Sequence, residues 1–232
     1  MLTSLTEQLL TGTDLSNEQV VEAVKHITSE EISAEEKANF LTALANKGES
    51  HEELAAFAGE LRDRATKVPL DEATRADEIL DVCGTGGDGL HTFNISTTVA
   101  LVCAAAGITV AKHGNRAITS KSGSADVLEA LGIPTDLSPT DAALALSKHG
   151  FAFLFAPLYH PAFKNIMPAR KLCAEAGQRT LFNFLGPLLN PAQPTAQLIG
   201  VPSAELTEPM AKVLQNLGIR RGMVVSGCVG DK

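Results

Sequence analysis

The first 61 residues place hydrophobic side chains at the spacing of amphipathic helices. Three stretches share one order, in which a serine is followed three residues later by Gln or Glu and then by an apolar stripe. This order predicts capping boxes, because the two side chains satisfy free amides at a helix start. We therefore predict consecutive helices, with Gly48 ending one of them. The predicted boxes are Ser16…Gln19, Ser33…Glu36 and Ser50…Glu53, followed by Val20, Val21, Val24 and Ile27, by Phe40, Leu41 and Leu44, and by Leu54, Phe57 and Leu61.

From Ile79 onward, short apolar runs alternate with helical stretches. Short apolar runs bounded by glycine are typical of strands buried in a parallel sheet. Their alternation with helices predicts βαβ units with right-handed crossovers. The predicted strands are Ile79–Val82, Ile108–Ala111, Phe151–Phe155, Gln197–Val201 and Met223–Ser226, and the predicted helices are Ser96–Ala106, Ser124–Leu131, one opening at Ser138-Pro139, Lys164–Ala176 and Ser203–Leu217.

The change of pattern near Val68–Glu72, where Pro69 interrupts a charged stretch, marks a predicted domain boundary. The predicted fold class is α/β, with a small all-helical N-terminal domain at residues 1–72 and a larger parallel-sheet domain at residues 73–232. The helix near 164–177 is a candidate to pack on the helical domain. A hydrophobic content of 44% and a charged content of 20% exclude disordered, collagen-like and low-complexity chains.

Charge is distributed unevenly along the chain. The net charge is −8, and residues 1–72 alone carry 6 Lys/Arg against 15 Asp/Glu. Between Asp88 and Asp126 there is no acidic residue and there are three bases, Lys112, Arg116 and Lys121. An acidic chain is not expected to bind nucleic acid or a membrane surface through bulk charge. The basic stretch inside it indicates a local site for an anionic ligand.

The four cysteines, Cys83, Cys103, Cys173 and Cys228, are widely spaced and have no metal-ligand spacing. They are expected to be free thiols in a reducing compartment. Residues 1–10 have no basic stretch before their apolar residues, and neither long uncharged run stays apolar over a bilayer's thickness. We therefore expect a cytoplasmic protein.

A first glycine-rich segment, Cys83–Gly89, follows a predicted strand. Its four glycines permit positive φ and close backbone approach, so that successive amides can face an anion. Asn94–Thr98 then opens a helix whose dipole favours phosphate. The alternative is a tight strand-to-helix turn, which glycine alone would explain. The segment lacks the Lys-Ser/Thr of a Walker loop and does not fit G-x-G-x-x-G, which disfavours nucleotide hydrolysis and dinucleotide binding.

A second segment, Lys112–Arg116, continues through Thr119–Ser124 to Asp126. Cations, hydroxyls and glycines after a strand provide the charges and directional donors that a diphosphate needs. A solvated loop is the alternative for these basic residues. Asp126 lies in the first turn of the next predicted helix, where a carboxylate also complements the helix dipole.

A third segment, Leu181–Pro191, has apolar residues typical of a structural corner. Arg170, upstream on a predicted helix, is by its position alone a surface charge.

In this order, Gly84–Asp88, Asn94–Thr97, Lys112–Arg116, Ser122–Leu131 and Asn183–Pro191 resemble the anthranilate phosphoribosyltransferase family of tryptophan biosynthesis. The resemblance implies a homodimer, through the helical domain, of the nucleoside phosphorylase/phosphoribosyltransferase type. It also implies transfer of phosphoribose from 5-phosphoribosyl 1-diphosphate to the amine of anthranilate, giving N-(5-phosphoribosyl)anthranilate and diphosphate, with Mg²⁺ as cofactor and two ions per active site.

The resemblance also assigns residues to this expected site. Anthranilate is expected at Gly84, Asn115 and Arg170, with His113 nearby, and Ser96 is the expected Mg²⁺ ligand. Under this assignment the forked guanidinium of Arg170 grips the anthranilate carboxylate. The residues implied for phosphoribosyl diphosphate are Gly84, Gly87, Asp88, Thr92, Asn94, Ile95, Ser96, Thr97, Lys112, His113, Gly114, Asn115, Arg116, Ala117, Ile118, Thr119, Ser120 and Ser124.

The chemistry of the transfer does not need a protein nucleophile. Positioning, amide donors, Lys and Mg²⁺ stabilise the charge on the departing diphosphate. No catalytic residue is assigned; His113 is the candidate proton acceptor, and a hydrogen-bonding loop residue is its alternative reading.

The chain departs from the family pattern near residue 226. Family members have His where Ser226 stands, followed by an Asp-Glu pair for a second Mg²⁺ and more of the α/β domain, whereas this sequence stops at Lys232. We therefore expect the α/β domain to be incomplete at its C-terminus, through truncation or as a shortened relative, with weak binding of phosphoribosyl diphosphate and low turnover.

Two other function classes stay open at the level of sequence. One is a pyrimidine nucleoside phosphorylase-like enzyme, and the other is a non-catalytic relative that binds anions or nucleic acid. Phosphate-dependent release of a base would indicate the former, and a DNA gel shift that survives moderate salt would indicate the latter.

Overall fold

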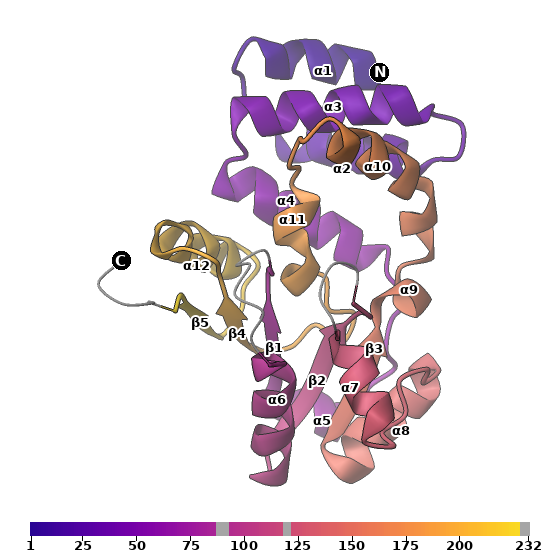
Figure 1. The fold of residues 1–232 in the computed structure, drawn as a ribbon, viewed down its shortest axis with the longest axis vertical. Helices are drawn as coiled ribbons and strands as arrows, with labels where there is room; N and C mark the ends of the chain where they lie inside the picture. The colour runs from indigo at the N-terminus through magenta and orange to yellow at the C-terminus, as the bar shows by residue number, and fades with distance from the viewer. Residues whose placement is uncertain (87–92, 118–121, 228–232) are drawn as a thin grey trace.

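The computed structural model of this chain describes residues 1–86, 93–117 and 122–227. Figure 1 shows a group of helices on one side of a twisted sheet, with α6, α7 and α8 beside the sheet's far end. In chain order the elements are α1 (Leu2–Leu10), α2 (Asn17–Thr28), α3 (Ala34–Lys47), α4 (His51–Asp63), α5 (Glu72–Ala76), β1 (Ile79–Gly84), α6 (Ile95–Ala105), β2 (Thr109–Gly114), α7 (Ser124–Ala130), α8 (Pro139–His149), β3 (Phe151–Phe155), α9 (Ala156–Tyr159), η1 (Pro161–Asn165), α10 (Met167–Glu175), α11 (Phe182–Leu185), η2 (Gly186–Leu188), β4 (Ala196–Gly200), η3 (Ala204–Leu206), α12 (Thr207–Asn216) and β5 (Arg221–Val225).

Two of the three predicted capping boxes are confirmed. At the start of α2, Ser16 accepts from the backbone of Gln19 and the Gln19 side chain accepts from the Ser16 amide. Ser50 and Glu53 exchange the same pair of bonds at the start of α4. Gly48 ends α3 with φ of 87°, a conformation that an L side chain rarely adopts. These helix ends were therefore readable from local sequence.

The third predicted box is only half formed. Ser33 accepts from the Glu36 amide at 3.1 Å. The Glu36 carboxylate instead accepts from Thr3 Oγ1 of α1 at 3.2 Å. The prediction of a reciprocal box at this position was therefore wrong, because a tertiary contact occupies the acceptor.

The sheet has the order β3-β2-β1-β4-β5, and every pairing in it is parallel. This confirms the predicted α/β class. Because the strands are parallel, their carboxyl ends share one edge: Gly84 pairs with Gly200, and Gly114 pairs with Phe155. Ligands of open α/β sheets bind at that edge.

The second strand is longer than the sequence indicated. The apolar run predicted a strand that stops at Ala111, whereas β2 continues to Gly114 and pairs with β3 over its last five residues. Lys112 and His113 are therefore strand residues, and the prediction that they follow the strand in a loop was wrong. Cross-strand pairing overrides the polar character of these residues, because backbone bonds do not depend on side-chain polarity.

Two predicted helices begin later than expected. Residues 161–165 form the 3₁₀ segment η1, and α10 begins only at Met167, with Pro168 in its first turn, where its missing N–H costs nothing. Similarly, the 3₁₀ segment η3 precedes α12, which begins at Thr207.

The largest hydrophobic core joins the helices to the sheet. It contains apolar residues of α1 to α4, α10 and α11 together with Ile199 of β4 and Val213 of α12. Helix α10 packs against α3, and α12 packs against α4 (Figure 1). The buried Lys37 ammonium donates to Ser29 O at 2.6 Å and to Asn165 O at 2.8 Å, which fastens η1 to the helical layer.

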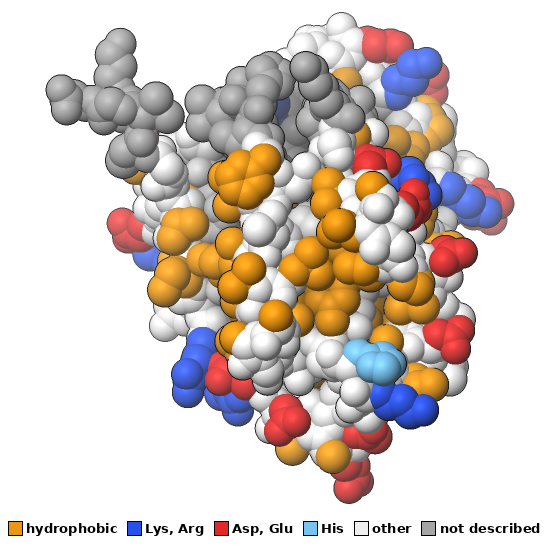
Figure 2. All heavy atoms as spheres, turned by 60° about the horizontal axis from the view of Figure 1, so that its bottom comes forward, with side chains coloured by type: hydrophobic (Ala, Val, Ile, Leu, Met, Phe, Trp, Pro, Cys, Tyr) orange, Lys and Arg blue, Asp and Glu red, His pale blue; other side chains and the backbone are white. Residues whose placement is uncertain are grey.

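The other face of the sheet carries α6 and α7 and is less covered. Figure 2 shows hydrophobic side chains gathered across this side of the molecule. Val102 of α6 and Met223 of β5 are more than half exposed. Within the described residues, β5 is an outer strand.

Three cysteines, Cys83, Cys103 and Cys173, are free thiols, whereas Cys228 lies outside the described residues. Among the helices of residues 1–86, 93–117 and 122–227, none combines the length and apolar character that crossing a bilayer requires.

Candidate functional site

The ammonium of Lys112 lies near the carboxyl end of β2 and is completely buried. Its Nζ donates to Val82 O of β1 at 2.7 Å and to Ser96 Oγ of α6 at 3.3 Å. The described residues give it no carboxylate partner at ion-pair distance. A buried cation at a helix N-terminus is unfavourable on its own, because both charges are positive. This arrangement is therefore suited to receiving an anion.

The first turn of α6 supplies further polar groups beside this lysine. Thr97 is buried, and its Oγ1 has no hydrogen-bond partner within the described residues. Asn94 Nδ2 donates to Ser122 O at 3.1 Å, which ties the helix start to the segment after β2. The Ile95 amide, by contrast, already donates to Phe93 O. Of these predicted site residues, Ser96 and Thr97 have hydroxyl groups that can still make further hydrogen bonds.

Asp81 lies beneath the strand ends, on the opposite face of the sheet from Lys112. Its Oδ1 accepts from the backbone amide of His113 at 3.3 Å. Burial raises the pKa of Asp81 to about 6, although the positive charge of Lys112 acts to lower it. Sequence reasoning did not single out this carboxylate, although its place in the middle of a buried strand was a signal.

His113 begins a row of rings that runs from β2 to α10. The His113 and His160 ring centroids are 5.2 Å apart, those of His160 and Phe163 are 5.3 Å apart, and those of Phe163 and Phe182 are 5.6 Å apart. Arg170 ends the row, with its guanidinium 5.2 Å from the Phe182 ring centroid. The predicted anthranilate residue Arg170 is thus connected to the strand ends through aromatic contacts.

Both histidines of this row are buried and neutral. Burial, reinforced by the neighbouring His160, lowers the pKa of His113 to about 3. Burial likewise lowers the pKa of His160 to about 4. Nε2 of each ring has no hydrogen-bond partner within the described residues. A histidine with so low a pKa is a weak proton acceptor.

Arg170 projects from α10 and is half-buried. Burial lowers the pKa of its guanidinium, whose Nη1 lies 3.9 Å from Met167 Sδ. In the described part of the chain no carboxylate pairs with it. A cavity of about 250 Å³ lies beside it and is lined by Arg170, Ala174, Gly177, Gln178, Arg179, Thr180 and Asn183.

Two glycines at the strand ends are required by close contacts or backbone conformation. A Cβ on Gly114 would lie 2.9 Å from Phe153 Cε2 and 3.3 Å from Ser124 Cβ, so any side chain there would force the buried Phe153 ring to shift. Gly86 has φ of 72°. Gly84 lies at the end of β1, paired with Gly200.

Arg116 and Ala117, both predicted phosphate contacts, are engaged elsewhere. The Arg116 guanidinium donates to Glu129 and lies 5.7 Å from the Phe155 ring centroid. The Ala117 amide donates to Asp126 Oδ2 at 3.0 Å. Asn115, by contrast, is exposed at the end of β2.

Six predicted site residues lie outside the described residues, namely Gly87, Asp88, Thr92, Ile118, Thr119 and Ser120. Among the residues that are described, no group of three or more His, Cys, Asp or Glu side chains is arranged to hold a metal ion.

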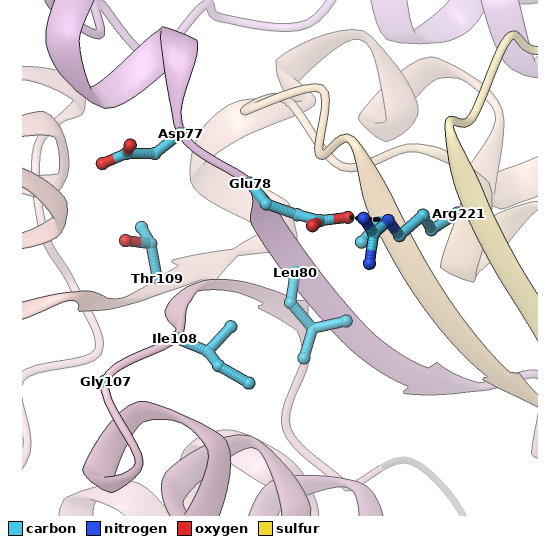
Figure 3. Close-up of a pocket in the computed structure, with 8 residues that line it drawn as sticks. Asp77, Glu78, Leu80, Gly107, Ile108, Thr109 and Arg221 are labelled. Atoms are coloured by element: carbon cyan, nitrogen blue, oxygen red, sulfur yellow. Dashed lines mark ion pairs between the residues drawn. The ribbon is translucent and has the colours of Figure 1, made fainter.

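A larger cavity, of about 490 Å³, lies at the amino ends of the strands, away from these residues. Figure 3 shows Glu78 of the segment before β1 pointing toward Arg221 of β5, and their ion pair is 3.1 Å long. The other residues that line this cavity are Asp77, Leu80, Gly107, Ile108, Thr109 and Ala196. It contains none of the predicted site residues.

His160, Phe163 and Phe182 were missed by the sequence analysis. His160 follows β3, which is the neighbour of β2, so the rule that ligands gather beyond parallel strand ends was a usable signal. Phe163 and Phe182 join the row only through tertiary packing.

Both parts of the chain match known proteins. Residues 3–65 match the family model "Glycosyl transferase family, helical bundle domain", and residues 76–232 match "Glycosyl transferase family, a/b domain". The chain is 46% identical over 230 residues to anthranilate phosphoribosyltransferase of Persephonella marina, covering 99% of this chain and 66% of that protein. It is 49% identical to the protein of the same name from Brevibacillus brevis, covering 99% and 65%. The chain thus spans just under two thirds of these relatives.

Solved structures of proteins with the same name also resemble this chain in fold. Anthranilate phosphoribosyltransferase (TrpD) from Thermus thermophilus superposes with a TM-score of 0.87 at 42% identity, covering 98% of this chain and 67% of that one. The Saccharomyces cerevisiae enzyme in complex with PRPP and Mg superposes with a TM-score of 0.84 at 30% identity, covering 99% and 66%. A variant of that enzyme in complex with 4-fluoroanthranilate superposes with a TM-score of 0.82 at 30% identity, covering 99% and 64%.

Proposed function

Because the chain belongs to the anthranilate phosphoribosyltransferase family of glycosyl transferases, we propose that it acts in tryptophan biosynthesis. The proposed reaction transfers the phosphoribosyl group of 5-phosphoribosyl 1-diphosphate to the amine of anthranilate and releases diphosphate. The observation that carries the proposal is the buried Lys112 ammonium, which meets the N-terminus of α6 at the carboxyl edge of the sheet.

The diphosphate leaving group is proposed to lie against Lys112 and the start of α6. Breaking the bond from ribose C1 to diphosphate places negative charge on the leaving oxygen. Fixed donors that face this oxygen stabilise the charge without reorganising, because Lys112 is already held by Val82 O. Ser96 Oγ and Thr97 Oγ1 lie in the first turn of the same helix. No group of the protein needs to form a covalent intermediate.

We propose Mg²⁺ as the cofactor, with Ser96 as one ligand and two ions per complete site. The donor set fits this ion, because a hydroxyl oxygen is a hard ligand and Mg²⁺ takes most of its coordination from water and substrate phosphates. Ser96 Oγ accepts one bond, from Lys112, and keeps a second lone pair. When bound, the ion would neutralise charge on the diphosphate.

Anthranilate is proposed to bind beside the ring row, between Asn115 and Arg170. A benzoate ring suits edge and face contacts with His113, His160 and Phe163. Its carboxylate suits the guanidinium of Arg170, which lacks an acidic partner among the described residues. The pKa of His113, about 3, favours a role in binding the ring over one in removing the amine proton.

The assembly state and compartment are also proposals. We propose a homodimer formed through the helical domain, in the cytoplasm. Leu10 and Val21, exposed by 70% and 42%, are apolar residues on that domain's surface that a partner would cover. Light scattering of the purified chain gives the mass directly, and a monomeric mass at micromolar concentration would contradict the homodimer.

The proposed function is tested by mixing the chain with Mg²⁺ and phosphoribosyl diphosphate in a calorimeter, and then by following anthranilate fluorescence after its addition. We expect heat of binding that disappears with EDTA, and a fluorescence change that requires both substrates. A folded sample that neither binds phosphoribosyl diphosphate nor consumes anthranilate would overturn the proposal. Phosphate-dependent release of a base from a pyrimidine nucleoside would identify a phosphorylase instead.

A further inference from the structure

The carboxylate of Asp126 links two segments that lie on either side of residues 118–121. Its Oδ2 accepts from the Gly123 amide at 2.7 Å, within its own helix start, and from the Ala117 amide at 3.0 Å. Only the first of these bonds belongs to an ordinary helix cap. The second joins the end of the β2 segment to the start of α7.

Arg116 and Glu129 hold this carboxylate in place. Arg116 Nη1 lies 3.5 Å from Asp126 Oδ1 and 2.8 Å from Glu129 Oε2. Thr135 Oγ1 donates to Glu129 at 2.6 Å. The guanidinium therefore pairs with two carboxylates, which makes it a support for Asp126.

The space around Gly123 shows how closely the two segments approach. A Cβ on Gly123 would overlap the Ala117 nitrogen and the Arg116 carbonyl carbon, and would lie 2.9 Å from Asn115 O. The Ala125 amide donates to the same Asn115 oxygen at 3.3 Å. Asn115 is thus held by the start of α7 through contacts that only glycine permits.

We propose that Asp126 is a positioning residue of the phosphoribosyl diphosphate site. It fixes the backbone of Asn115–Ala117 against the start of α7, so that Asn115 and Ser124 face the carboxyl edge of the sheet, and it does not itself bind substrate. This inference rests on the proposed function.

The direction in which affinity changes when the Asp126 carboxylate is removed distinguishes a positioning role from a purely electrostatic one. A carboxylate near an anion site repels the anion, so that electrostatics alone predicts tighter binding when it is removed. Positioning predicts weaker binding. Asp126 stays ionised in the assay range, because its bonds to the Ala117 and Gly123 amides lower the pKa of its carboxyl.

Asp141 offers a matched control. It occupies the same third position of helix α8, where Ser138 Oγ donates to its Oδ2 at 2.6 Å and accepts from its amide. Both of these bonds stay within the start of its own helix. Asp141→Ala therefore removes a first-turn carboxylate without releasing a second segment.

The experiment measures the dissociation constant of Mg²⁺-phosphoribosyl diphosphate by calorimetry, and the melting temperature, for both variants and the wild-type chain. We expect Asp126→Ala to raise the dissociation constant about tenfold, the effect of one or two lost hydrogen bonds to a charged group. We expect Asp141→Ala to leave it within about twofold. A merely structural role would lower the melting temperatures of both variants and leave both dissociation constants unchanged.

Two further variants keep the inference falsifiable if Asp126→Ala does not fold. Asp126→Asn keeps the shape and one acceptor oxygen, and we expect a smaller loss of affinity. Gly123→Ala separates the same segments by sterics, and we expect a loss like that of Asp126→Ala, whereas Gly59→Ala, in α4 with only an ordinary contact 3.9 Å away, should bind normally.

Failure of the inference is distinct from failure of the proposed function. If the wild-type chain does not bind phosphoribosyl diphosphate, the proposed function fails. If the wild-type chain binds it and the folded Asp126 variants bind equally well or more tightly, the positioning role of Asp126 is overturned while the function stands.

Discussion

Two buried lysines, one in the helical domain and one at the strand ends, are treated differently by the structure. Lys47 Nζ lies 2.6 Å from Asp14 Oδ1 and 2.7 Å from Glu53 Oε2, and Glu53 also accepts from the Leu15 and Ser50 amides. Lys112 has a carbonyl and a hydroxyl as partners. Lys47 is thus paired directly with carboxylates, whereas Lys112 has no carboxylate at ion-pair distance among the described residues and only the more distant charge of Asp81 opposes its own.

The surroundings of Lys112 explain why this difference bears on the binding of an anion. Lys37 in the helical domain also lacks a paired carboxylate among the described residues, but two backbone carbonyls hold its ammonium. Lys112 instead faces the N-terminus of α6, where the helix dipole adds positive potential. A cation in that position is held at a cost to stability, which an arriving diphosphate would offset. Direct pairing with carboxylates therefore distinguishes Lys47 from Lys112, and the position of Lys112 at a helix N-terminus distinguishes it from Lys37.

The largest expected effect is the loss of stability on breaking the carboxylate pairs of Lys47. Lys47→Met leaves Glu53, exposed by 1%, without its cation, and we expect a loss of about 3 kcal/mol in the free energy of unfolding. Urea denaturation measures it. The control is Lys25→Met, whose exposed pair with Glu22 at 3.9 Å should contribute less than about 1 kcal/mol. Equal losses for the two variants would contradict the comparison.

The second effect is on substrate binding. Lys112→Met should reduce kcat/KM, or affinity where turnover is too low to measure, about 100-fold, which is typical of losing one preorganised donor to a developing anion. Its stability should stay equal or rise, because an apolar side chain replaces a buried charge of similar length. Retained binding of Mg²⁺-phosphoribosyl diphosphate in a folded Lys112→Met chain would show that this cation is structural.

Arg170 should act on the acceptor alone. Arg170→Gln removes the forked cation at the end of the ring row, and we expect about a tenfold higher KM for anthranilate with unchanged affinity for phosphoribosyl diphosphate. Lys171→Gln, at the neighbouring exposed position, should change neither value. Loss of phosphoribosyl diphosphate binding in Arg170→Gln would refute the assigned role.

The smallest expected effect is a loss of stability in mild acid that originates at the strand ends. The folded-state pKa values of His113 and His160 are lowered to about 3 and about 4, so below about pH 6.5 the unfolded chain binds more protons and stability falls. Asp81, with its pKa raised to about 6, takes up a proton in the folded state and partly opposes this. The net loss between about pH 6.5 and 5.5 should be about 1 kcal/mol.

Urea denaturation at the two pH values measures this dependence. His160→Gln should reduce the loss, whereas His149→Gln, at an exposed position of α8, should not. An unchanged pH dependence in His160→Gln would place its origin elsewhere.

Local sequence was sufficient for the parts of the fold that depend on near neighbours. The capping boxes at Ser16 and Ser50, the end of α3 at Gly48 and the alternation of strands with helices were all predicted correctly. Each depends on bonds within a few residues or on one side chain's conformational preference, so a short stretch of sequence contains the whole cause.

The candidate site was only partly predictable. The basic stretch and the glycine-rich segment predicted a candidate site at the ends of β1 and β2. They did not predict which groups its side chains contact. Arg116 was expected to contact phosphate, which stays a prediction; the sequence did not show that its guanidinium pairs with Glu129, thirteen residues later. His113 was expected in a loop, and pairing with β3 makes it a buried strand residue next to His160.

The sequence by itself therefore determined the helices, the parallel sheet and which stretch contains the basic and glycine-rich residues of the candidate site. Only the tertiary structure decided which charges are neutralised and which rings form the row from His113 to Arg170. The physical reason is that local conformation follows from bonds between near neighbours, whereas charge pairing and burial follow from the distances between segments far apart in the chain.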